Sequence, residues 1–173
     1  MDADMKRQLK EIKRRLDQLP EAIGVTPKGN QVTKKRRVRS ALRASAKKFV
    51  PALQAATPMS KRPHMRYLSD GQKIKYHPGN LRKSHRIITF KKASPLSIFV
   101  GPKRDRGKQT KYGITKFDPY YAHFIEEGTR NFAAKPFMRK AHDQAKQAVM
   151  QDLKKRVENI FRYHAKQKKL GKI

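Results

Sequence analysis

An apolar stripe that begins at Phe137 constrains the fold more than any other feature of this sequence. Its members recur every three or four residues, the period of one face of an α-helix: Phe137, Ala141, Ala145, Val149, Leu153, Val157 and Ile160 or Phe161. Pro136 precedes the stripe, and proline suits the start of a helix because the N–H that it lacks would have no partner there. We therefore predict a helix from Pro136 to about His164. At roughly 1.5 Å per residue it would be on the order of 40 Å long. A small core cannot cover that length, so we expect part of the helix to contact another subunit.

Two further helices are predicted in the N-terminal third. The first spans about Asp4–Leu19 and has one apolar face, which is formed by Met5, Leu9, Ile12, Leu16 and Leu19. The second spans about Thr33–Ala56, and Pro51 should kink it because proline removes one backbone hydrogen bond. Between them, Thr26–Asn30 is rich in turn formers and is predicted to be a linker. We expect the Leu9/Ile12/Leu16 face, and the end of the last helix near Val157 and Phe161, to be partly exposed in an isolated subunit. Changing Leu16 to Asp should then yield soluble but unassembled protein.

The strand candidates lie in the middle of the chain. His85–Phe90 and Leu96–Val100 are rich in Ile, Thr, Phe and Val, with a turn at Ala93–Pro95, and Gly101-Pro102 should end the second strand. Residues 59–80 are irregular except for one predicted hairpin, in which Asp70-Gly71 suits a two-residue turn. Together these elements predict an α+β fold. A small antiparallel sheet should pack against the long C-terminal helix and the N-terminal helices.

Composition limits the size of the core. The chain has 173 residues, of which 36% are hydrophobic, and it contains no cysteine that could form a disulfide or a thiolate metal site. We expect one domain over residues 1–165 and a basic tail over 166–173. No apolar run approaches the roughly 20 residues of a membrane helix. The N-terminus has no signal-peptide hydrophobic region, so we expect synthesis in the cytoplasm and no membrane partner.

The charge is strongly basic and uneven. Lys and Arg number 44 against 13 Asp and Glu, a formal net charge of +31. Between Lys28 and Lys116 there are 25 basic residues and only two acidic ones. Such a surplus favours polyanions and opposes compaction. We expect Lys103–Lys116 to form a mobile loop, and we expect any DNA binding to be salt-sensitive and independent of sequence. The candidate contacts to DNA or to acidic partners are Lys34, Lys35, Arg36, Arg37, Arg39, Arg104, Arg106, Lys108, Lys111 and Lys116.

Two motifs lie next to each other before and at the start of the last helix. Tyr121-Ala-His-Phe-Ile-Glu-Glu-Gly-Thr129 is an aromatic and acidic run that ends where the chain must turn, and Ala133-Ala-Lys-Pro-Phe-Met-Arg-Lys-Ala141 follows it. Gly128 is expected to supply a positive φ or a close backbone approach. Tyr121 and Phe124 are expected to be core or interface aromatics. One of Glu126 and Glu127 is expected to pair with a cation such as Arg82 or Arg139.

The order of these motifs resembles the neck and tail-completion family of long-tailed bacteriophages. The resemblance spans about Leu9 to Phe161 and also includes Pro58, Gly79–Ser84 and Phe99-Val-Gly101. It departs from the family in the hairpin region inserted at residues 59–80 and in the excess of basic charge. The motif and interface residues that it implies are Tyr121, Phe124, Glu126, Glu127, Gly128, Thr129, Pro136, Phe137 and Arg139.

The resemblance implies a virion structural protein rather than an enzyme. Copies would form a ring, by resemblance a hexamer, that joins the portal side of the capsid to the tail around the DNA channel. The implied partners are further copies of the chain, neighbouring neck and portal-side proteins, tail-terminator or tail-tube proteins, and non-specific DNA in the channel.

The residues themselves indicate no enzyme, cofactor or metal. Glu126 and Glu127 are adjacent, have no evident partner base, and should affect folding or assembly if changed. None of the six histidines lies in the His-Glu-x-x-His pattern of a helical metal site: His64, His77, His85, His123, His142 and His164. The alternative function is a strongly basic nucleic-acid-binding protein of ribosomal or nucleoid type. The charge supports it, although no named binding motif does. A ring encoded beside portal and tail genes, or a monomer that binds RNA tightly, would distinguish the two.

Overall fold

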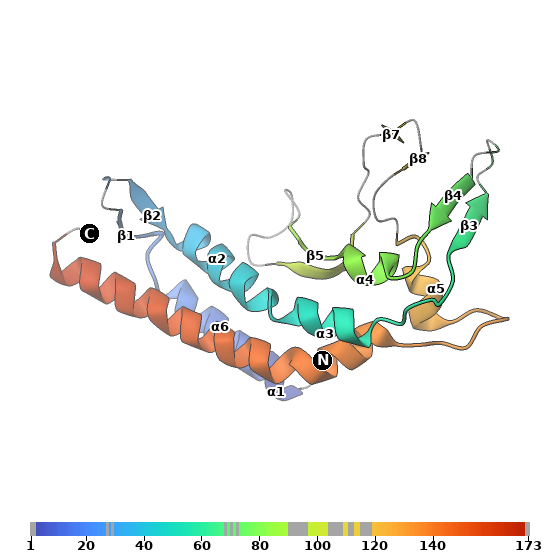
Figure 1. Cartoon of the computed structure of the whole chain (residues 1–173). Helices are drawn as coiled ribbons and strands as arrows, with labels where there is room; N and C mark the ends of the chain where they lie inside the picture. The colour runs from blue at the N-terminus through green and yellow to red at the C-terminus, as the bar shows by residue number, and fades with distance from the viewer. Residues whose placement is uncertain are drawn as a thin grey trace. The chain divides into compact units, whose positions relative to one another are not determined.

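The computed structural model describes residues 3–26, 28, 30–67, 69, 71, 73–89, 97–103, 109–110, 113–114 and 119–171. Helices and antiparallel strand pairs alternate along these residues, which confirms the α+β class (Figure 1). The chain divides into two compact units. Unit 1 comprises residues 1–48, 89–98 and 146–173, and unit 2 comprises residues 49–88 and 99–145. The longest helix, α6 (Phe137–Lys169), contributes its first residues to unit 2 and the rest to unit 1.

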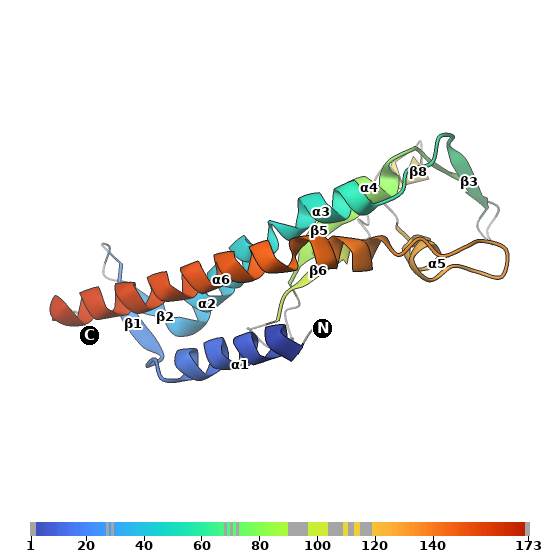
Figure 2. The same ribbon diagram turned by 90° about the horizontal axis from the view of Figure 1, so that it is seen from below.

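Unit 1 is built from long helices and one short hairpin. Its elements are α1 (Ala3–Asp17), β1 (Ala22–Val25), β2 (Gln31–Thr33), α2 (Lys34–Ala46) and the C-terminal part of α6 (Figure 2). The strands β1 and β2 pair antiparallel, with Gly24 opposite Val32. The stretch expected to be a linker is therefore the connection of a hairpin, in which the Thr26 N–H donates to the Asn30 carbonyl. Strands this short have too few alternating positions to be recognised from sequence.

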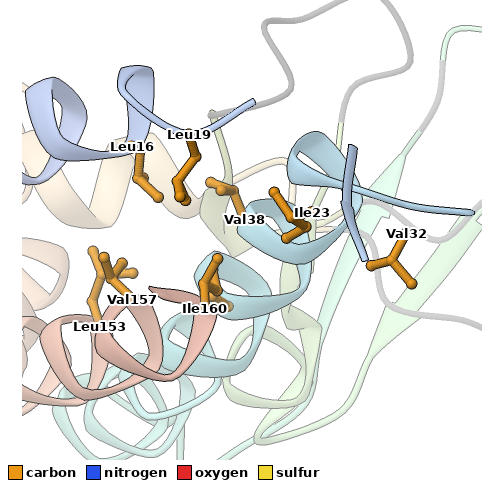
Figure 3. Packing of buried hydrophobic residues seen from close by; sticks show 9 residues of the cluster. Leu16, Leu19, Ile23, Val32, Val38, Leu153, Val157 and Ile160 are labelled. Atoms are coloured by element: carbon orange, nitrogen blue, oxygen red, sulfur yellow. The ribbon is translucent and has the colours of Figure 1, made fainter. Parts of the chain in front are cut away.

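The core of unit 1 is aliphatic. Leu16 of α1 and Leu19, just beyond the end of that helix, face Leu153 and Val157 of α6 (Figure 3). Ile23, Val32, Val38, Ala41 and Ile160 complete the buried cluster, and Leu9, Ile12 and Phe161 pack against it while remaining partly exposed. The expectation of an exposed assembly face was therefore wrong for Leu16 and Val157, which are 7% and 2% exposed. Leu16 and Val157 are buried because the apolar stripes of α1 and α6 pack against each other within unit 1. Leu16→Asp should consequently disrupt unit 1 itself.

The helix predicted for Thr33–Ala56 is two helices rather than one kinked helix. α2 ends at Ala46 and α3 (Phe49–Ala56) begins three residues later, so that Pro51 lies in the first turn of α3. In a continuous helix the ring of Pro51 would clash with the carbonyl of Lys47, four residues earlier. When a new helix begins at Phe49, Lys47 lies outside it and the clash is removed. The N–H that Pro51 lacks is also not needed, because first-turn N–H groups have no intrahelical partner.

Unit 2 is built from short elements. In addition to α3 and the start of α6, it contains β3 (His64–Tyr67), β4 (Lys73–Tyr76), α4 (Asn80–Ser84), β5 (His85–Ile88), β6 (Phe99–Pro102), β7 (Gln109–Thr110), β8 (Gly113–Ile114) and α5 (Ala122–Glu127). Its described strands form three separate antiparallel pairs, β3–β4, β5–β6 and β7–β8. The buried cluster consists of Leu53, Leu81, Ala122, Phe137 and Ala141.

The strand predictions in unit 2 were partly right. The hairpin expected between residues 59 and 80 is present as β3–β4, whose described pairing ends at Tyr67 opposite Lys73. The turn expected at Asp70-Gly71 is not described in full, because Asp70 lies outside the described residues. β6 runs from Phe99 to Pro102, so the strand ends at the predicted Gly101-Pro102 pair but includes both residues instead of ending at Val100. Proline is tolerated there because Pro102 is the last residue of a strand with a single neighbour.

The last helix extends beyond its predicted end. α6 has 33 residues and continues through Lys169, so its length is about 50 Å and the first residues of the expected basic tail are helical. The predicted stripe is buried except at Val149, which is half-exposed while the neighbouring Met150 is buried. A strict four-residue step drifts around a helix of 3.6 residues per turn, and this drift brings Met150 inward.

Candidate assembly site and basic helix face

The carboxylate of Glu126 holds the start of α6 in unit 2. Its Oε2 accepts the backbone N–H of Met138 at 2.9 Å, and its Oε1 accepts that of Arg139 at 3.2 Å. The first N–H groups of a helix lack intrahelical partners and carry partial positive charge, so a carboxylate there is stabilising. Glu126 thus contacts Arg139 through the backbone, and Arg82 instead donates to the Thr57 carbonyl. Within the chain, the expected pairing of Glu126 with a guanidinium is therefore replaced by these backbone contacts, while a pairing of Glu127, or one across a ring interface, stays a prediction.

Gly128 permits the turn between α5 and α6. Its φ of +81° lies in the region that favours glycine, and it closes α5 with its N–H on the Phe124 carbonyl. A Cβ here would lie 2.8 Å from the backbone nitrogen of Ala134 and 2.9 Å from the Phe132 carbonyl oxygen. Both observations confirm the role expected for this glycine. Thr129 then pairs with Phe132 in a small bridge, and the Lys135 N–H returns to the Ile125 carbonyl at 2.7 Å.

The second motif places one aromatic ring in the core. Pro136 directly precedes α6, as predicted, and Phe137 is 1% exposed. The Phe137 ring packs with Leu53, Leu81 and Ala122, which come from α3, α4 and α5. The two motifs therefore join four short segments of unit 2 around one buried side chain.

An apolar groove adjoins the motifs within unit 2. It has a volume of about 430 Å³ and is lined by Pro58, Met59, Ser60, His64, His77, Pro78, Gly79, Leu81, Tyr121, Phe124, Ile125, Thr129, Phe132 and Lys135. Met59 is 57% exposed, and Phe124 and Phe132 are each 43% exposed. Tyr121 lies at its inner side, where its ring packs edge-on against His64 and Tyr76. The other expected motif residues, Glu127 and Arg139, are exposed.

His85, a buried histidine at the start of β5, forms a hydrogen bond with Thr57 in unit 2. The Thr57 hydroxyl donates to the Leu53 carbonyl, so it accepts at 2.6 Å from Nε2 of His85. His85 is 3% exposed, and its Nδ1 has no hydrogen-bond partner in the described part of the chain. Burial lowers the pKa of His85 to about 4, so the ring is neutral at pH 7. Sequence reasoning assigned no role to this histidine, and nothing in its local pattern distinguishes it from the exposed ones.

The basic run at the start of α2 divides into two groups. Lys34 and Arg37 are half-buried and serve unit 1: the Lys34 ammonium donates to the Leu19 carbonyl at 2.8 Å, and the Arg37 guanidinium lies 4.0 Å from the Tyr163 ring centroid. The others are exposed and line a shallow surface hollow of about 520 Å³. Its lining residues are Thr33, Lys35, Arg36, Arg39, Ser40 and Arg43.

Of the predicted contacts, Lys35, Arg36 and Arg39 therefore share one surface, whereas Lys34 and Arg37 are turned away from it. The prediction missed Arg43, which the spacing of Arg36, Arg39 and Arg43 along one helix face could have revealed. Arg104, Arg106, Lys108, Lys111 and Lys116, together with most of the expected mobile loop, lie outside the described residues.

No group of three or more His, Asp or Glu side chains that could hold a metal occurs among the residues with described positions. Within the described ranges, no helix combines the length and the apolar composition of a membrane span. Comparison with family models, with curated proteins and with solved structures found no match to this chain.

Proposed function

We propose that this chain is a structural subunit of a bacteriophage neck, a ring-forming head–tail connector or tail-completion protein. One observation carries the proposal: four of the stretches that resemble the family contribute to one packed cluster of unit 2. Gly79–Ser84 provides the buried Leu81, the first motif provides Ala122, and the second provides Phe137, while Val100 of Phe99–Gly101 is partly buried and packs against them. These stretches are distant in sequence but pack together in unit 2, which supports an arrangement in which they act as one structural unit.

The chemistry of the motif residues supports an assembly role over a catalytic one. Glu126 is engaged by two backbone N–H groups, Gly128 is required by a tight turn, and Phe137 is buried. All three residues stabilise the local fold, and we infer that they hold the neighbouring surface in a fixed conformation. The surface held rigid is the apolar groove, whose exposed rings suit contact with a neighbouring protein more than contact with water. Neighbouring copies and the adjoining neck, portal-side and tail proteins are the proposed partners, and the virion neck is the proposed location.

The test is the oligomeric state of the purified full chain, measured by native mass spectrometry and by negative-stain electron microscopy. Wild-type protein should form a ring. The double variant Phe124→Asp/Phe132→Asp, which places charge in the groove, should remain folded but unassembled. Leu170→Asp is the matched control, because Leu170 is also exposed but lies in unit 1. A wild-type chain that stays monomeric at high concentration, alone and mixed with portal or tail-tube protein, would contradict the proposal.

The second candidate is a basic nucleic-acid-binding protein of ribosomal or nucleoid type. The net charge of +31 and the exposed arginines of α2 favour it. It predicts a monomer whose affinity for RNA is high and whose mass does not change with concentration. The same native mass spectra, recorded with and without RNA, separate the two candidates.

A further inference from the structure

We propose that the exposed face of α2 in unit 1 is a binding site for the phosphate backbone of duplex nucleic acid, and that it does not read base sequence. Arg36, Arg39 and Arg43 are spaced three and four residues apart, so they lie on one side of the helix. Lys35 and the hydroxyls of Thr33 and Ser40 complete the lining of the same hollow. Four cationic side chains and two hydroxyls thus face one concave surface.

The charge of this face is not neutralised within unit 1. In the described ranges, the carboxylates of Glu11, Glu158 and Asp152 form ion pairs with other basic residues, namely Arg14, Arg15, Lys48 and Arg156. Among the described residues, the ion pair at this face is that of Glu21 with Lys35, at 3.8 Å. By sequence, unit 1 contains 26 Lys and Arg and seven Asp and Glu, a net charge of +19. A bound polyanion would relieve this repulsion.

The lining favours nucleic acid over an acidic protein. Protein interfaces depend on buried aromatic or aliphatic anchors, and none of the six lining residues could receive or provide one. Arginine, lysine, serine and threonine are the side chains that contact phosphate oxygens in protein–DNA complexes. Stacking aromatics, which single-strand binding sites require, are also missing from the lining. The duplex backbone is therefore the ligand that fits.

The dimensions agree with several phosphate contacts. The interval from Lys35 to Arg43 is eight residues, or about 12 Å of helix. That length equals three to four phosphate steps of one strand, at about 3.4 Å each along the duplex axis. The inference rests on the α2 face alone and holds whether or not the chain joins phage heads to tails.

The experiment measures binding of the full chain to a fluorescent 20-base-pair duplex by anisotropy, between 50 and 200 mM salt. The triple variant Arg36→Gln/Arg39→Gln/Arg43→Gln removes three cations from the hollow. Because each phosphate contact adds about 0.9 to the log–log salt slope, the variant should lower the slope by about 2.7. The matched control Lys6→Gln/Lys10→Gln/Lys13→Gln removes the same charge from exposed positions of α1 in unit 1 and should lower the slope by less than about 1. Duplexes of unrelated sequence should compete equally.

Two outcomes would overturn the proposal. If both triple variants lose the same affinity and slope, net charge alone attracts DNA and α2 is not a site. If wild-type protein binds polyglutamate as tightly as duplex of equal charge, with the same dependence on the three arginines, the face recognises acidic protein instead. Circular dichroism of each variant checks folding, which the substitutions should preserve because all six side chains are exposed. The single variant Arg39→Gln, with an expected slope change of about 0.9, repeats the test with the smallest perturbation.

Discussion

Each unit contains an ionisable side chain with a strongly shifted pKa, Asp152 in unit 1 and His85 in unit 2, and their hydrogen bonding differs. Asp152 of unit 1 accepts hydrogen bonds from Arg156 at 2.6 Å, from Ser45 at 2.9 Å and from Lys48 at 3.0 Å. The bond from Arg156, followed by those from Lys48 and Ser45, lowers the pKa of Asp152 to about 2 against the opposing effect of its partial burial. His85 of unit 2 has one neutral partner, and burial lowers its pKa to about 4.

The cores of the two units also differ in how many contacts hold each element in place. Unit 1 buries aliphatic stripes of long helices, so that nine buried side chains share one cluster. Unit 2 fixes short segments through single hydrogen bonds, such as those of Glu126, and around the single ring of Phe137. Unit 2 should therefore be the more sensitive to one substitution or to one proton, and each prediction below tests that difference.

The largest effect is expected from Phe137→Ala. Removing a fully buried ring typically costs about 3–5 kcal/mol of unfolding free energy, because packing is lost and a cavity remains. Hydrogen exchange followed by mass spectrometry should show faster exchange of the amides of unit 2, with those of α1 and α2 less affected. The control Phe132→Ala, at a ring that is 43% exposed, should change stability little. Equal loss of protection in both units would show that they do not unfold separately.

A pH titration should weaken unit 2 before unit 1. The pKa of His85 is about 4 when folded and about 6.5 when unfolded, so the unfolded chain binds the extra proton between these values. Stability of unit 2 should fall as the pH falls from 6.5 to 4, by about 3 kcal/mol, and should level off below pH 4. Asp152, whose folded pKa is about 2, keeps its contribution until the pH falls below about 3.8.

The measurement is urea denaturation between pH 7 and pH 3, compared with the variant His85→Gln. The variant should lose most of the pH dependence between 6.5 and 4. A wild-type curve that is flat over that range would contradict the assignment of a neutral, buried His85.

The sequence was sufficient to predict the helices whose apolar residues recur with a helical period. The stripes of α1 and α6 are long enough to set a period, and the predicted start of α6 at Pro136 is one residue from its observed start at Phe137. The positive φ of Gly128 followed from residue type alone. Periodicity does not show which apolar stripes pack against each other. Leu16 was therefore expected on an exposed face, whereas it is buried against α6.

The candidate sites were predictable only in part. One of Glu126 and Glu127 was expected to pair with a cation. The bond from the Met138 N–H to Glu126 could not be predicted, because the sequence does not show that the start of α6 packs against α5. The pairing of Thr57 with His85 joins residues 28 positions apart and has no local pattern. On α2, the basic run was evident, but the inward turn of Lys34 and Arg37 depends on Leu19 and Tyr163, which are distant in sequence.

Glu126→Ala should destabilise unit 2 by about 2 kcal/mol. It removes two charge-assisted hydrogen bonds from the first turn of α6, each of which acts where the helix dipole is positive. Glu127→Ala is the matched control, since it removes the same charge from the neighbouring exposed position and should change the free energy of unfolding by less than about 0.5 kcal/mol. Equal effects of the two substitutions, measured by urea denaturation at pH 7, would show that charge alone and not the bonds to α6 is responsible.

The smallest effect is expected from Thr33→Ala in unit 1. Thr33 is the N-cap of α2, and its hydroxyl accepts the Arg36 N–H at 3.3 Å. Loss of such a cap costs about 1 kcal/mol. The control Ser40→Ala, an exposed position inside the same helix, should be neutral or slightly stabilising because alanine favours helices. Both are compared by thermal denaturation without nucleic acid, since both residues line the proposed phosphate site. Because the Thr33 cap bonds only its own helix, its loss should fray α2 locally, whereas loss of Glu126 separates α5 from α6. If Thr33→Ala destabilises the chain as much as Glu126→Ala, the proposed contrast is wrong, because unit 1 is then as sensitive to the loss of one hydrogen bond as unit 2.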